Sequence, residues 1–78
     1  MTRRFVVREF TWIGSSHAPE QIDVNVLDSQ DCYRRLAGWT SHAMSRRDRR
    51  QLGPDGVREA LRNRAHGYAA ILEHELNP

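Results

Sequence analysis

A chain of 78 residues has room for one domain, and its Leu, Ile, Val and Phe residues, 16 in all, supply only a thin hydrophobic core. The formal net charge is +2, and all 12 basic residues are arginine. No apolar run approaches the roughly 20 residues of a membrane span, and a single cysteine excludes an internal disulfide. We therefore expect one small α+β domain over residues 1–78, cytoplasmic and without a membrane segment.

Two segments near the N-terminus favour β structure. Residues 3–13 carry apolar side chains on both faces of an extended chain, and residues 22–26 alternate apolar with Asp or Asn, as in a strand buried on one face. Residues 14–19, Gly-Ser-Ser-His-Ala-Pro, have the composition of a loop. The pair predicts a β-hairpin. Because two strands alone are marginally stable, a homodimer through the N-terminal hairpin is one expected assembly.

Residues 29–37 are predicted to form a short helix. Asp28 stands where an N-cap would be, and Gly38 stands where a left-handed residue would end the helix. Trp39, just past this glycine, is then expected to fold back on Tyr33 as part of the core.

The segment Ser45 to Arg50 reads Ser-Arg-Arg-Asp-Arg-Arg and concentrates positive charge. Ser45 and Asp48 form a cap-like pair and Gly53-Pro54 breaks the chain, so a second short helix is predicted between them. At 100° per residue the four arginines fall within an arc of about 160°, pointing to solvent together. Guanidinium groups fork onto phosphate or carboxylate oxygens. A GC-rich genome would leave the same all-arginine composition.

The last element has the clearest pattern. Apolar residues at spacings of 4, 4, 3, 4 and 4 predict an amphipathic helix from about Asp55 to Leu76. The residues of this stripe are Val57, Leu61, Ala65, Tyr68, Leu72 and Leu76. The expected fold is therefore α+β, with an N-terminal β-hairpin followed by two short helices and one long C-terminal amphipathic helix.

No pattern predicts catalysis or a bound cofactor. Cys32 lies near the start of a predicted helix, but no Cys/His motif accompanies it, and a buried apolar cysteine is the favoured interpretation. His66 and His74 are about 12 Å apart along a helix and cannot share a metal ion. The acidic residues show no paired-carboxylate pattern. We therefore expect no enzyme activity, cofactor, metal or small-molecule substrate.

The leading hypothesis is a binding module whose arginines contact nucleic acid. Its predicted contact residues are Arg46, Arg47, Arg49 and Arg50, with Arg34 and Arg35 as an extension. Two alternatives stay open at this point. The same arginines could dock on an acidic protein surface, as in an adaptor or inhibitor, or they could be the solvated face of a plain homodimeric structural protein.

Three segments in sequence order carry a resemblance to a known family. They are Ile22-Asp-Val-Asn-Val-Leu27, Asp31-Cys-Tyr-Arg-Arg-Leu36 and Glu59-Ala-Leu-Arg-Asn-Arg64. Together they resemble small bacterial proteins grouped as domain of unknown function fourteen eighty-eight. That family's usual spacing between helices and its final C-terminal strand have no counterpart in this sequence. The resemblance implies a small α+β fold and carries no site residues.

Overall fold

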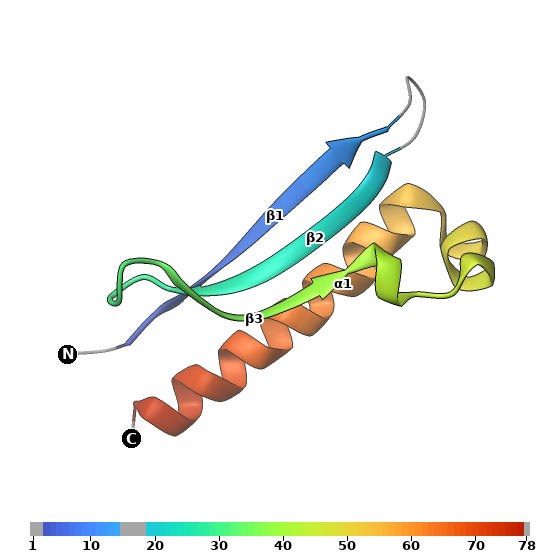
Figure 1. Cartoon of the computed structure of the whole chain (residues 1–78). Helices are drawn as coiled ribbons and strands as arrows, with labels where there is room; N and C mark the ends of the chain where they lie inside the picture. Colours follow the sequence, from blue (N-terminus) through green and yellow to red (C-terminus); the bar gives the residue numbers. More distant parts are fainter. Residues whose placement is uncertain (1–2, 15–18, 78) are drawn as a thin grey trace.

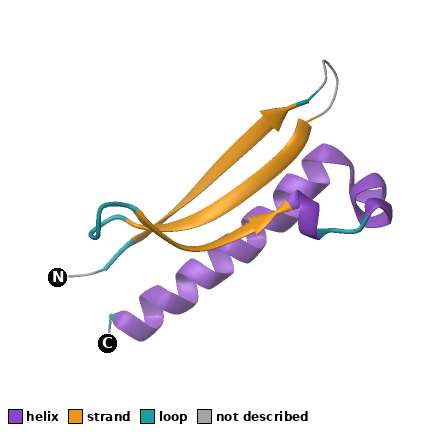
Figure 2. Ribbon diagram, viewed as in Figure 1, coloured by secondary structure: helices purple, strands orange, loops and turns teal. Residues whose placement is uncertain are grey.

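The computed structural model describes residues 3–14 and 19–77 and contains a three-stranded antiparallel sheet with one long helix against it (Figures 1 and 2). The strands are β1 (Phe5–Ile13), β2 (Pro19–Asp28) and β3 (Arg34–Thr40), in the order β1-β2-β3. A 3₁₀ turn, η1 (Ser41–Ala43), leads to the helix α1 (Arg46–Leu76). Neither helical element in the described ranges has both the length and the apolar character needed to cross a membrane.

The predicted pairing of the first two strands is confirmed. Phe5 lies opposite Asp28 and Trp12 opposite Gln21, in an antiparallel register that shifts only between Trp12 and Ile13. Most of the predicted connecting loop, residues 15–18, lies outside the described residues.

The predicted helix over residues 29–37 is wrong: the fold is α+β as expected, but it is not a hairpin followed by two short helices and one long helix. The chain makes a tight turn here and returns as β3. Asp31 N–H donates to the Asp28 carbonyl at 3.2 Å, and Arg34 N–H donates to the Asp31 carbonyl at 3.0 Å. Cys32 and Tyr33, between the bonded ends of the second turn, both have φ of 54°, as the central residues of a type I′ hairpin turn do.

Other residues that were expected to end or cover this helix have different places in the fold. Gly38 does not end a helix; it lies within β3 opposite Asn25. Trp39 folds onto the long helix rather than onto Tyr33, with its ring centroid 5.6 Å from that of Tyr68 in an edge-to-face contact. Cys32 is exposed at the turn, so the prediction of a buried cysteine is also wrong.

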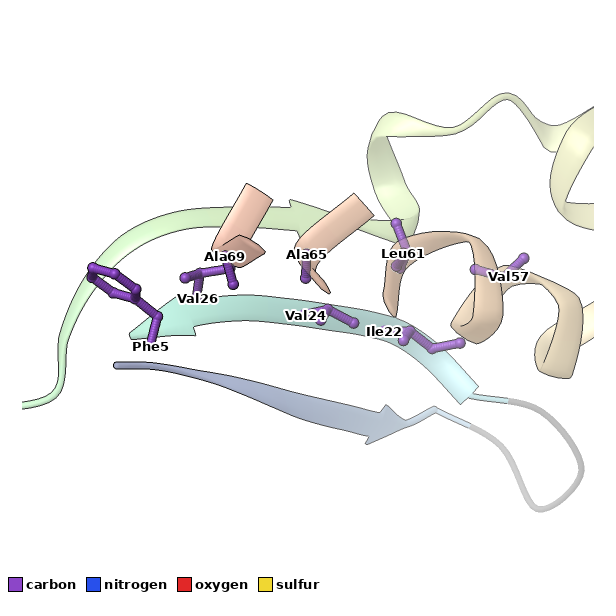
Figure 3. Close-up of a cluster of buried hydrophobic side chains, with 8 residues drawn as sticks. All are labelled: Phe5, Ile22, Val24, Val26, Val57, Leu61, Ala65 and Ala69. Carbon is purple, nitrogen blue, oxygen red and sulfur yellow. The ribbon is translucent and has the colours of Figure 1, made fainter. Parts of the chain in front are cut away.

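The hydrophobic core lies between one face of the sheet and α1. Figure 3 shows its eight buried side chains, which come from β1, β2 and the helix. They are Phe5, Ile22, Val24, Val26, Val57, Leu61, Ala65 and Ala69. The helix contributes successive positions four residues apart, and both alanines are small enough to bring its backbone close to β2. The predicted stripe is confirmed over its first half, whereas Leu76 is 46% exposed.

Polar contacts join the end of α1 to the start of β1, and these two described ends lie near each other in Figure 1. The Asn77 side chain accepts from Arg3 N–H at 2.8 Å and donates to the Arg3 carbonyl at 2.9 Å. The Arg3 guanidinium pairs with the fully buried carboxylate of Asp28. Further along, Arg62 makes two hydrogen bonds of 2.9 Å to Glu9, which raise the pKa of Arg62. The helix is thus fixed against the sheet at several points.

Candidate anion-binding site

The arginine run occupies a short first part of α1, which a bend separates from the rest. The hydroxyl of Ser45 accepts from Asp48 N–H at 3.0 Å, so the predicted cap is confirmed. Gly53 has φ of 71° and ψ of 171°, which no helix residue adopts, and Pro54 follows it. Figure 1 shows the first part of α1, in yellow, turned away from the axis of the long part, in orange and red. The predicted break at Gly53 is confirmed.

Three of the four arginines line one hollow of about 310 Å³ between the short helical part, the start of β2 and the first turn of the long helical part. They are Arg46, Arg49 and Arg50. At 100° per residue these three fall within an arc of about 100°, and Arg47 lies beyond its edge. Arg47 is exposed and does not line the hollow. Arg49 is half-buried, whereas Arg46, Arg47 and Arg50 are exposed.

The lining of the hollow combines apolar residues with positively charged ones. Ile22 and Val57, both buried, form part of its lining together with Pro19 and Pro54. Glu20 is the one acidic residue among the lining residues, against three arginines. The lining residues therefore carry net positive charge.

The guanidinium groups of the hollow are left without acidic partners. Within the described part of the chain, none of Arg46, Arg49 and Arg50 takes part in an ion pair. The Nε of Arg49 is buried and has no hydrogen-bond acceptor among the described residues. A buried donor without an acceptor costs about 1–3 kcal/mol, a cost that a hydrogen bond to an acceptor would offset. The arrangement favours a bound oxyanion.

The structure separates Arg34 and Arg35 from this hollow. Both lie on β3 rather than on a helix, because the segment that carries them pairs with β2. The Nε of Arg34 lies 3.1 Å from a carboxylate oxygen of Asp31, in an exposed ion pair. Arg35 lines a different hollow, on the sheet. The six predicted contact residues therefore do not form one surface.

Among residues 3–14 and 19–77, no three His, Cys, Asp or Glu side chains come close enough together to hold a metal ion. Comparison of the chain with models of known protein families, with curated proteins and with solved structures finds no match, so the resemblance described above stays a prediction.

Proposed function

We propose that this chain is a non-enzymatic binding module that takes the phosphate groups of nucleic acid into the hollow lined by Arg46, Arg49 and Arg50. The observation that supports it is that three arginines line one hollow, that none of them forms an ion pair with a described residue, and that the buried Nε–H of Arg49 lacks an acceptor among the described residues. A phosphodiester supplies two anionic oxygens that a guanidinium can bind through paired hydrogen bonds.

Phosphate fits the hollow better than an acidic protein surface does. Protein interfaces draw much of their free energy from apolar and aromatic area at the centre of the contact. Here two apolar residues of the lining, Ile22 and Val57, are already buried within the fold, and Arg46 and Arg50 of the lining are exposed. Binding that depends on charge alone is typical of contacts to a nucleic-acid backbone.

The test compares two variants of equal charge. The hollow variant carries Arg46→Gln, Arg49→Gln and Arg50→Gln, and the control variant carries glutamine at Arg4, Arg47 and Arg64 instead. Both changes lower the net charge from +2 to −1, since each removes three positive charges. The three control residues are exposed, and none of them lines the hollow.

The measurement is the affinity for a fluorescent oligonucleotide, by anisotropy, between about 50 and 200 mM salt. The slope of log affinity against log salt is negative, and loss of three phosphate contacts should reduce its magnitude by about 2 for a single strand. The control variant should keep the wild-type slope to within about 0.5. Equal slopes for the two variants would show that the hollow is not the phosphate site. Tighter binding of wild type to polyglutamate than to the oligonucleotide would also contradict the proposal.

A further inference from the structure

The face of the sheet turned away from α1 carries three exposed aromatic side chains. In the described part of the chain no helix lies against this face (Figures 1 and 2). Phe10 and Trp12, on β1, are 41% and 57% exposed, and Tyr33, in the turn before β3, is 53% exposed. The Cζ of Arg8, also on this face, lies 5.6 Å from the centroid of the Tyr33 ring. An exposed aromatic patch of this kind indicates a site of interaction with a partner.

A polar hollow of about 330 Å³ lies next to the aromatic residues on the β2 and β3 part of the same face. Its lining includes the polar residues Gln21, Asp23, Asn25, Arg35 and His42. Gly38 also lines it, and a Cβ atom there would lie 2.5 Å from the Asn25 side-chain oxygen. The missing side chain of Gly38 thus helps to keep open a space lined with hydrogen-bond donors and acceptors.

Asp23 is the one acidic side chain that the described strand residues place on this face, and it already accepts hydrogen bonds from neighbouring side chains. Trp12 Nε1–H donates to it at 3.2 Å and the Gln21 amide at 2.8 Å. Burial raises the pKa of Asp23, but hydrogen bonds from Gln21, Thr40 and Trp12 and the nearby charge of His42 outweigh this, so the pKa lies below its usual value. The hydrogen bond to Asp23 also holds the Trp12 indole in position above the strand.

We propose that this open face binds single-stranded nucleic acid, with bases stacked on Trp12 and Phe10 and base edges hydrogen-bonded in the hollow over Gly38. This inference rests on the proposed function, because it takes nucleic acid as the ligand and names its class. Phe10 and Trp12 are two positions apart on one face, about 7 Å along the strand, so each ring can take a separate base. Stacking of this kind needs bases that are free of a duplex.

The charge of the face favours a polyanion over a second copy of the chain. Among the described strand residues, Arg8 and Arg35 lie on it, against one carboxylate, that of Asp23. Two copies packed face to face would set a cationic surface against a cationic surface, which opposes association. A nucleic-acid strand meets the same arginines with its phosphates and the aromatic rings with its bases.

The experiment follows the fluorescence of Trp12 in a Trp39→Phe background, which leaves one indole in the chain. Oligothymidylate of about 16 nucleotides should quench this fluorescence on binding, and a duplex of the same length should not. In wild type, Trp12→Ala and Phe10→Ala should each weaken binding of the single strand by roughly 5- to 100-fold. The matched control is Ile71→Ala, since Ile71 is 58% exposed but lies on α1, and its affinity should equal that of wild type.

The outcomes separate this inference from the proposed function. Wild-type affinity in both aromatic variants, without quenching, would overturn the inference. This holds even if the affinity of the hollow variant of Arg46, Arg49 and Arg50 depends less steeply on salt than that of wild type. Weaker binding in the aromatic variants together with an unchanged slope in the hollow variant would support the open face and contradict the arginine hollow. Sedimentation provides a further check: a wild-type dimer that Trp12→Ala converts to a monomer would assign the face to a second copy and overturn the inference.

Discussion

Gly53 offers a direct test of the bend in α1, because its effect on stability can be worked out from the backbone alone. Its φ of 71° with ψ of 171° lies in a region that only glycine populates readily. A Cβ atom built at Gly53 would meet nothing within 4 Å, so a substitution adds no clash. The cost of Gly53→Ala is therefore conformational.

The magnitude follows from two opposing terms. Holding a non-glycine residue at such dihedral angles costs about 1–3 kcal/mol. Alanine also restricts the unfolded chain, which returns about 0.4–1 kcal/mol. We expect Gly53→Ala to lower the free energy of unfolding by about 0.5–2 kcal/mol. For a domain of this size that corresponds to a fall in Tm of roughly 2–16 °C.

Gly67 supplies the matched control within the same helix. A Cβ atom there also meets nothing within 4 Å, but its backbone is helical and exposed. Gly67→Ala should therefore raise stability by about 0.5–1 kcal/mol. The assay is thermal and urea unfolding of wild type and the two variants, followed by circular dichroism. If Gly53→Ala stabilises the protein as much as Gly67→Ala does, α1 runs without a bend and the reasoning fails.

Three further predictions concern single contacts. Arg3→Ala leaves the buried carboxylate of Asp28 without its cation and should cost about 2–3 kcal/mol in urea unfolding, whereas exposed Arg4→Ala should stay within about 0.5 kcal/mol; equal losses would contradict the buried pair. Cys32→Asn should stabilise the protein by roughly 0.5 kcal/mol, because asparagine tolerates the positive φ of 54° better; a loss of stability would argue against this turn. The pKa of Asp23 is lowered on folding, so its stabilising contribution is present above the unfolded pKa and is lost as pH falls through the folded pKa; the stability difference between wild type and Asp23→Asn should shrink below about pH 4, and a constant difference would refute this.

Local sequence patterns correctly predicted the elements whose structure is decided by residues close together in the chain. The apolar spacing from Val57 onward predicted the long helix, and the Ser45 cap and the Gly53 break predicted the ends of the arginine segment. The alternation in residues 22–26 predicted a strand with one buried face, and its pairing with β1 followed. In each case the residues that decide the structure lie within a few positions of one another.

Residues 29–37 could not be assigned in this way, because their local signals fit two structures. Asp28 can cap a helix or start a turn, and its carboxylate in fact accepts from Gln30 N–H at 3.0 Å in the turn. What decides between them is distant in sequence: β2 has a free edge, and residues 34–40 can pair with it. The positive φ of Cys32 and Tyr33 could not be predicted from the sequence, since neither residue type favours it.

The candidate site, too, could be predicted from the sequence only in part. A count of charges was enough to single out the run from Arg46 to Arg50. Which of its arginines share a hollow depends on how Gly53 turns the short helical part relative to β2, and no local pattern encodes that direction. Likewise, the open face became visible only once β3 and α1 were in place, since the sequence showed β1 as apolar on both sides and left its covering undecided.

Gly53 therefore links the stability of the fold to the geometry of the arginine hollow. A straight helix would carry the seven residues before Gly53 a further 10 Å or so along its axis, away from Pro19 and Ile22 at the start of β2. The hollow exists because the chain turns back at this point. Gly53→Ala keeps all 12 arginines and the net charge of +2, yet it should weaken phosphate binding if the bend places the guanidinium groups. Unchanged salt dependence in a folded Gly53→Ala variant would mean that the arginines act through charge alone, and not through the shape of the hollow.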